Sequence, residues 1–259
     1  MSDPSDGDVD DITENLRGLV VSNLFEEPPP KEDCPICMLP MPFASGVRGV
    51  STTYYPCCGK LVCDGCVLAA NEEIAEGRMK DLCPFCRKPL PRSDEDIVRQ
   101  FEKRIELNDG YAFYKLGCGY KFELWGAQDN ERAFQLFERS VELGCTIAHH
   151  SIAYAYKNGQ GVEEDFLKSI AHSEFAAVGG HEGARLNLGM VDKHIGRMDR
   201  AMKHFVVAAR SGFDVALKEV GEGYKAGHIT KDEYASTLRA FKDASDEMKS
   251  EQRTRAEIN

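Results

Sequence analysis

Apolar residues recur at helical spacing through the C-terminal two thirds of the chain. Ser93 is followed by three acidic residues, which is typical of a helix start, because serine caps free backbone amides and acidic side chains favour the positive end of the helix dipole. Val98, Phe101 and Ile105 then repeat at every third or fourth position. We therefore expect a connecting helix within residues 92–108, and the pattern after it stays helical.

The helical pattern after residue 108 is periodic. Short stretches of the form AFYKLG, AHHSIA, ARLNLG and ALKEVG begin 36, 36 and 32 residues apart, at Ala112, Ala148, Ala184 and Ala216. Glycines keep step at the unit ends, 36 and 32 residues apart, at Gly144, Gly180 and Gly212. A period of this size predicts stacked helix-turn-helix units. We expect an α-solenoid of about four repeats over residues 109–245, followed by a polar helical tail over residues 246–259.

These units resemble Sel1-like repeats, relatives of the tetratricopeptide repeat. The residues that carry the resemblance are AHHSIAYAYKNGQG from Ala148 to Gly161, then Val162, Asp165, and Ala176 through Gly180. Sel1-like repeats are known as protein-interaction scaffolds. The resemblance therefore implies that the solenoid binds a protein partner.

Charge is concentrated at the N-terminus. The chain has a formal net charge of −11, and residues 1–33 contain 10 acidic and 2 basic side chains. This composition predicts an acidic, mostly disordered arm. Apolar residues at helical spacing run from Ile12 to Leu24, and they fit either a short partner-docking helix or a transient helix that rests on the next domain.

The ten cysteines suggest metal binding. Eight lie within residues 34–91, in three C-x2-C pairs plus the adjacent pair Cys57-Cys58. No secretory signal or apolar membrane span is visible, so we expect an intracellular protein, cytoplasmic or nuclear, in which thiols stay reduced. A segment this small needs a metal to be stable, and C-x2-C turns converge on tetrahedral zinc. Disulfide and redox interpretations remain as minor alternatives.

The cysteine segment resembles a RING finger, in which ligand pairs one and three bind one zinc ion and pairs two and four bind the other. This resemblance implies a first site of Cys34, Cys37, Cys63 and Cys66, and a second site of Cys57, Cys58, Cys83 and Cys86. The expected fold class is therefore mainly α, with a small cross-braced two-zinc finger ahead of the solenoid.

One position departs from the usual RING pattern. Lys60 stands where many RING fingers have a ligating histidine, and an ammonium group has no lone pair for zinc. Cys57 is the obvious replacement, which gives an all-cysteine variant. If Cys58 alone binds at this point, the second zinc has three protein ligands.

The resemblance also implies a function. RING fingers are best known as ubiquitin ligase modules that carry no nucleophile and position a ubiquitin-conjugating enzyme with its ubiquitin. The matching positions for conjugating-enzyme contact are Ile36, Pro84 and Arg87. The leading hypothesis is an E3 ubiquitin ligase or ligase adaptor whose repeats bind the substrate protein. The alternatives are a non-catalytic scaffold with structural zinc, and an adaptor that docks the conjugating enzyme without activating it.

The same sequence argues against other partners. A global basic surface is absent, so we expect no nucleic-acid binding, and we expect no membrane binding. Cys118 and Cys145 lie in the solenoid, far from the cluster, where small buried cysteines commonly fill space.

Overall fold

A computed structural model describes residues 23–41, 52–124 and 127–258, and it is mainly helical. The cysteine-rich part contains β1 (Thr52–Tyr55) and β2 (Lys60–Cys63), an antiparallel hairpin in which Thr52 pairs with Cys63 and Tyr55 with Lys60. Helix α2 (Asp64–Ala75) follows β2 directly. Among the described helices, none is both long and apolar enough to cross a bilayer.

The remaining helices are α3, the antiparallel pairs from α4 to α11, and α12 at the C-terminus. Their bounds are α3 (Asp94–Ile105), α4 (Gly110–Lys121), α5 (Asn130–Glu142), α6 (Ile147–Asn158), α7 (Phe166–Val178), α8 (Glu182–His194), α9 (Met198–Arg210), α10 (Asp214–Lys225), α11 (Lys231–Glu247) and α12 (Glu251–Ile258). The closest packing is within α4/α5, α6/α7 and α8/α9, and α10 and α11 both pack on α9. The predicted solenoid of four helix pairs is confirmed.

The small residues that revealed the repeat have the roles that their spacing predicted. Ala112, Ala148, Ala184 and Ala216 are all fully buried on the first helix of each pair. The closing glycines have φ angles of +82°, +89° and +91° at residues 144, 180 and 212, a left-handed conformation that other residues adopt reluctantly. A Cβ on Gly117 would come within 2.7 Å of the Phe137 ring, so this glycine sets the close approach of α4 and α5.

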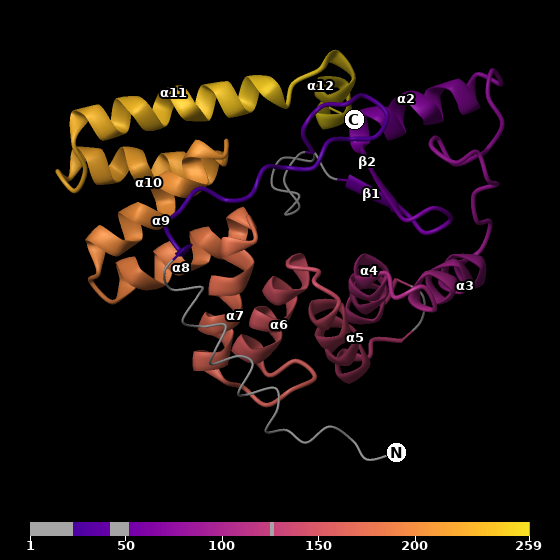
Figure 1. Cartoon of the computed structure of the whole chain (residues 1–259), viewed down its shortest axis with the longest axis horizontal. Coiled ribbons are helices and arrows are strands. Elements are labelled where there is room, and N and C mark those ends of the chain that lie inside the picture. Colours follow the sequence, from indigo (N-terminus) through magenta and orange to yellow (C-terminus); the bar gives the residue numbers. More distant parts are fainter. Residues whose placement is uncertain (1–22, 42–51, 125–126, 259) are drawn as a thin grey trace.

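The chain closes on itself, because both ends of the solenoid contact the cysteine-rich part (Figure 1). Helix α12 packs against α2 at the C-terminus, far from it in sequence. Before the first cysteine, residues 24–31 contact α7, α8 and α9 on the way to the cysteine-rich part. Residues 1–22 of the acidic arm, with most of the apolar stretch Ile12–Leu24, lie outside the described residues.

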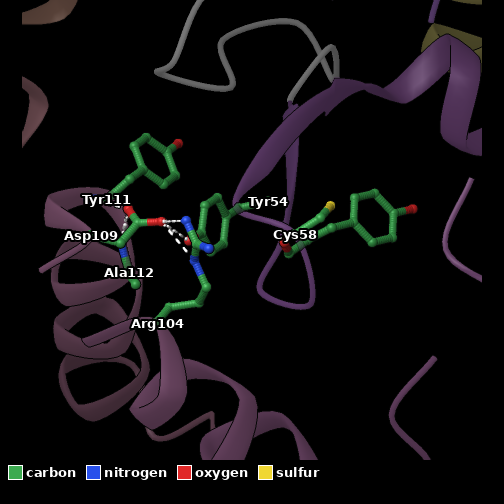
Figure 2. Close-up of polar contacts among 7 residues, drawn as sticks. Tyr54, Cys58, Arg104, Asp109, Tyr111 and Ala112 are labelled. Carbon is green, nitrogen blue, oxygen red and sulfur yellow. Dashed lines mark hydrogen bonds and ion pairs between the residues drawn. The ribbon is translucent and has the colours of Figure 1, made fainter. Parts of the chain in front are cut away.

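One polar network joins the hairpin to the first repeat (Figure 2). Asp109 is the N-cap of α4 and accepts hydrogen bonds from the amides of Tyr111 and Ala112. The same carboxylate accepts a 2.7 Å hydrogen bond from the Tyr54 hydroxyl and is paired with the Arg104 guanidinium at 2.5 Å. Burial opposes ionisation of Asp109, but these hydrogen bonds outweigh it and hold its pKa below the usual range.

Candidate metal centre

Two turns of the same design present the first and last cysteine pairs. In one, the Cys34 amide donates to Leu39 O at 2.9 Å and an isolated bridge joins Asp33 to Pro40. In the other, the Cys83 amide donates to Lys88 O at 2.7 Å and a bridge joins Leu82 to Pro89. Met38 and Arg87 follow the second cysteine of each turn with φ angles of +56° and +62°. This tight backbone brings both sulfurs of each C-x2-C pair to one side.

The other four cysteines come from the hairpin and the helix after it. Cys57 and Cys58 form the hairpin turn, in which the amides of Cys58 and Gly59 both donate to Tyr55 O at 3.1 and 2.8 Å. Cys63 ends β2, and Cys66 lies in the first turn of α2. The hairpin turn between β1 and β2 is tight enough for the adjacent Cys57 and Cys58 to direct their sulfurs to one point.

The eight sulfurs converge in two groups of four. One group is Cys34, Cys37, Cys63 and Cys66, the other is Cys57, Cys58, Cys83 and Cys86, and the sulfurs within each group lie within 4.8 Å of one another. These are the pairings that the RING resemblance implied. Cys57 is a full member of the second group, whereas Lys60 is exposed at the start of β2.

The sulfur spacing fits a tetrahedral metal. Sulfur–sulfur distances are 3.9 Å for Cys34–Cys66, 3.7 Å for Cys37–Cys63, 3.4 Å for Cys57–Cys86 and 4.0 Å for Cys58–Cys83. A zinc–thiolate site with Zn–S bonds of about 2.3 Å has sulfur–sulfur edges of about 3.8 Å. All ten cysteines carry free thiols, so disulfides do not explain the convergence. Each group can therefore hold one zinc ion.

Burial favours the neutral thiol form in both groups. It raises the pKa of Cys57 and Cys66, and that of Cys58 to about 11. Cys34 differs: burial again opposes ionisation, but hydrogen bonds from neighbouring backbone amides outweigh it and lower its pKa to about 7. Four crowded thiols ionise together only when a cation offsets their charge, which is what metal binding provides.

A residue from the far end of the chain contacts the first group. Arg253 on α12 is 2% exposed and donates to Pro40 O at 2.7 Å, Leu39 O at 3.2 Å and Cys37 Sγ at 3.5 Å. Its guanidinium brings a positive charge to a cluster that would be anionic with zinc bound. No sequence signal marks Arg253, because it lies in a polar tail 216 residues from Cys37.

Ile36, Pro84 and Arg87 line one open groove of about 410 Å³ beside the first cysteine group. The groove is also lined by Ala69, Ala70 and Glu73 of α2 and by Gln252 of α12. Ile36 is 41% exposed, as a contact residue must be. The Arg87 guanidinium lies 2.8 Å from Sδ of Met79, which also lines the groove. Ile36 from the first cysteine turn and Pro84 and Arg87 from the last thus share one surface.

No family model matches the chain. It is 30% identical over 114 residues to the chitin synthase regulator SKT5 of Saccharomyces cerevisiae, a match that covers 41% of this chain and 16% of that protein. The chain thus spans about a sixth of the curated relative.

Two solved structures are similar. A Sel1 repeat protein from Oxalobacter formigenes is 22% identical with a TM-score of 0.50, over 63% of this chain and 66% of that one. A protective antigen of uropathogenic Escherichia coli with an SLR fold is 27% identical with a TM-score of 0.49, over 59% of this chain and 33% of that one. The similarity to the Oxalobacter formigenes repeat protein shows that the paired helices described above have the Sel1-repeat fold.

Proposed function

We propose that this protein is a RING-type E3 ubiquitin ligase, or an adaptor of one, whose finger binds two zinc ions and docks a ubiquitin-conjugating enzyme. The observation that carries the proposal is the groove that unites Ile36, Pro84 and Arg87 beside the cysteine groups. The proposal places the protein in the cytoplasm or nucleus, where the thiols stay reduced.

The residues of the groove would act by positioning. The exposed Ile36 and the rigid Pro84 offer an apolar contact to the conjugating enzyme, and the Arg87 guanidinium can bridge to ubiquitin through charge-assisted hydrogen bonds. The finger supplies no nucleophile, so acceleration comes from holding the thioester-linked ubiquitin in a reactive orientation. The zinc ions, when bound, supply folding stability to a finger with little hydrophobic core.

The repeats would select the substrate protein. The Sel1-repeat fold stacks helix pairs into an extended surface, and stacked repeats of this kind commonly offer such a surface to partners. Contacts between the finger and both ends of the solenoid would hold the two functions in one body. Substrate and ubiquitin would then meet at a set distance.

A discharge assay tests the finger. Full-length protein is mixed with a panel of conjugating enzymes loaded with ubiquitin, and loss of the thioester is followed over time. The expected result is faster discharge with at least one enzyme, abolished docking in Ile36→Ala, and retained docking with slow discharge in Arg87→Ala. The matched control is Arg99→Ala, which removes an exposed arginine on α3 outside the groove.

Metal content is measured on the same preparations, with about two zinc ions per chain expected for every variant. Zinc-replete protein that accelerates discharge with no member of a broad panel would refute ligase activity. Docking without acceleration would leave only the adaptor form of the proposal.

A second candidate is a non-catalytic scaffold in which zinc is purely structural. It is favoured by the sequence similarity to a protein described as a regulator of chitin synthase. The two candidates differ at the groove, because a scaffold that uses only its repeats would keep partner binding in Ile36→Ala and Arg87→Ala.

A further inference from the structure

The segment before the finger occupies a defined site on the repeats. Leu24 is 1% exposed and packs with Ala177 of α7 and Leu188 of α8. The ring of Phe25 lies 4.8 Å from the ring of His204, and the cationic groups of Arg200 and Lys203 lie over it at 5.7 and 5.5 Å. The side chain of Leu24 is thus held by apolar packing, and the ring of Phe25 is held by an aromatic contact and two cation–π contacts.

The site also binds the backbone of the segment. Arg185 of α8 is 2% exposed, and it donates to Leu24 O at 2.5 Å and to Ala177 O at 2.7 Å. A carbonyl is present in every residue, so this contact recognises the backbone at Leu24, which lies in a turn closed by a 3.1 Å hydrogen bond from the Glu26 amide to Asn23 O. Burying a guanidinium is costly unless it is well hydrogen-bonded, and the carbonyls of Leu24 and Ala177 both accept from this one.

A third contact lies seven residues along the segment. The Lys31 ammonium is 3.8 Å from the carboxylate of Glu182, which is itself buried. Between the two ends, Pro28 and Pro29 pass over Gly180, where an added Cβ would be 3.5 Å from Pro28 Cβ. The prolines keep the segment extended, so Leu24 and Lys31 stay far enough apart to reach both contacts.

The surface under this segment is unlike the other helix pairs. Within the described residues, every buried acidic side chain lies on α7 or α8, namely Glu174, Glu182 and Asp192. Arg200 of α9 pairs with Glu174 at 3.1 Å and with Asp192 at 2.9 Å. Repeat packing elsewhere uses alanine and large apolar residues. Charged groups of both signs beside the apolar contact of Leu24 with Ala177 and Leu188 give this surface both the polar and the apolar elements that recognition sites use.

We propose that the α7–α9 surface is the peptide-binding site of the repeats and that residues 23–31 occupy it in cis. Its partner would be a protein with an exposed segment of the same chemistry: a leucine and an aromatic residue together in a turn, and a basic residue about seven positions after the leucine. Such a partner binds by displacing the chain's own segment. The proposal rests on the repeats binding a protein, and it adds which surface they use and what blocks it.

Competition in cis makes a measurable difference. A tethered segment faces its site at an effective concentration on the order of 1 mM. For a peptide whose intrinsic Kd is about 100 µM, competition from the tethered segment raises the apparent Kd about tenfold. Weakening the segment should therefore tighten binding of the same peptide in trans by about tenfold.

The probe is a fluorescein-labelled peptide with the sequence of residues 21–33, and binding to the full-length chain is followed by fluorescence anisotropy. The double variant Leu24→Ala/Phe25→Ala is expected to bind the probe about tenfold more tightly than the wild type. Adding Glu182→Gln should weaken probe binding again. The control probe has alanine at both positions and should not bind. A folded double variant that binds no better than wild type would overturn the proposal.

A second measurement uses only the wild-type chain, in case the double variant does not fold. Hydrogen exchange of residues 23–31 is followed by mass spectrometry while an isotopically heavy copy of the peptide is added in excess. Faster exchange in this segment supports displacement, and unchanged exchange up to millimolar peptide overturns it. Neither measurement involves ubiquitin, so failure here is separate from failure of the ligase assay.

Discussion

Arg253 offers a sharp test of how the C-terminal helix stabilises the finger. The substitution is Arg253→Ala, which removes a side chain that is 2% exposed and bonded to two finger carbonyls and one cysteine sulfur. Each lost hydrogen bond is worth about 1 kcal/mol net, and a charged donor such as Arg253 makes each bond worth at least that much. Three bonds to the finger therefore add up to about 3 kcal/mol. We expect docking of α12 on α2 to weaken by about 3 kcal/mol, a factor of about 150 in the docking equilibrium.

The effect is read in two ways on the zinc-loaded protein. Hydrogen exchange should speed up in α12 and in residues 38–41, because both sides of the contact lose protection. A chromogenic chelator should remove one of the two zinc ions about 10- to 100-fold faster, as expected when a hydrogen bond to a metal-bound sulfur is lost. The zinc proposed for the group of Cys57, Cys58, Cys83 and Cys86 should be released at the wild-type rate.

The control is Arg255→Ala. Arg255 lies on the same helix and pairs with Glu72 of α2, but its side chain is 52% exposed, so its loss should cost no more than about 1 kcal/mol. Equal exchange and equal zinc release in the two variants would refute the reasoning, since a buried and an exposed arginine would then contribute alike.

Three further predictions concern the metal and the junction. Cys57→Ser should lower zinc from about two ions per chain toward one by elemental analysis, while Cys118→Ser, in the solenoid, should leave it unchanged. Chelation should unfold the finger and leave most of the helical circular dichroism signal, because the repeats have separate apolar cores. Asp109→Asn should lower the free energy of urea unfolding by about 2 kcal/mol, because Arg104 and Tyr54 lose a charged acceptor. The pKa of Asp109 is lowered in the folded state, so its contribution to folding stability is fully present above about pH 4 and is lost as pH falls through the folded pKa. Because the variant lacks this contribution, its free energy of unfolding should fall less than that of the wild type on acidification.

The solenoid was predictable because its signal is periodic. Four alanines and three glycines recur at offsets of 36 or 32 residues. The alanines are small because they are fully buried between helices, and the glycines are required by a left-handed backbone conformation. Local helix starts were equally visible: Ser93 accepts a hydrogen bond from the Asp96 amide, as an N-cap serine should. Helix caps and helix ends depend on interactions between residues that are close in sequence, so they can be predicted without knowing the fold.

The grouping of the cysteines needed more than spacing. Three C-x2-C pairs and one adjacent pair can be matched in several ways, and the resemblance to a RING finger selected the crossed arrangement that the structure shows. The contacts of Arg253 and Leu24 had no such guide. They join residues 216 and 161 positions apart, and although helical spacing was visible before Leu24 and in the C-terminal tail, no local pattern identifies the distant partner of a single contact.

These long-range contacts matter for function because they join the finger to the repeats at separate points. Tyr54 reaches Asp109 at the start of the solenoid, Leu24 reaches Arg185 in its middle, and Arg253 brings its end to Cys37. One flexible linker would leave a substrate on the repeats at a low effective concentration near the groove, whereas several contacts restrict the search to a few orientations. The Leu24 contact differs from the other two, because a peptide with matching chemistry can replace it. Partner binding at α7–α9 would then free the segment that leads into Cys34 while the Asp109 and Arg253 contacts keep the finger on the solenoid, so recognition at the repeats would reach the first metal group through ten residues of chain.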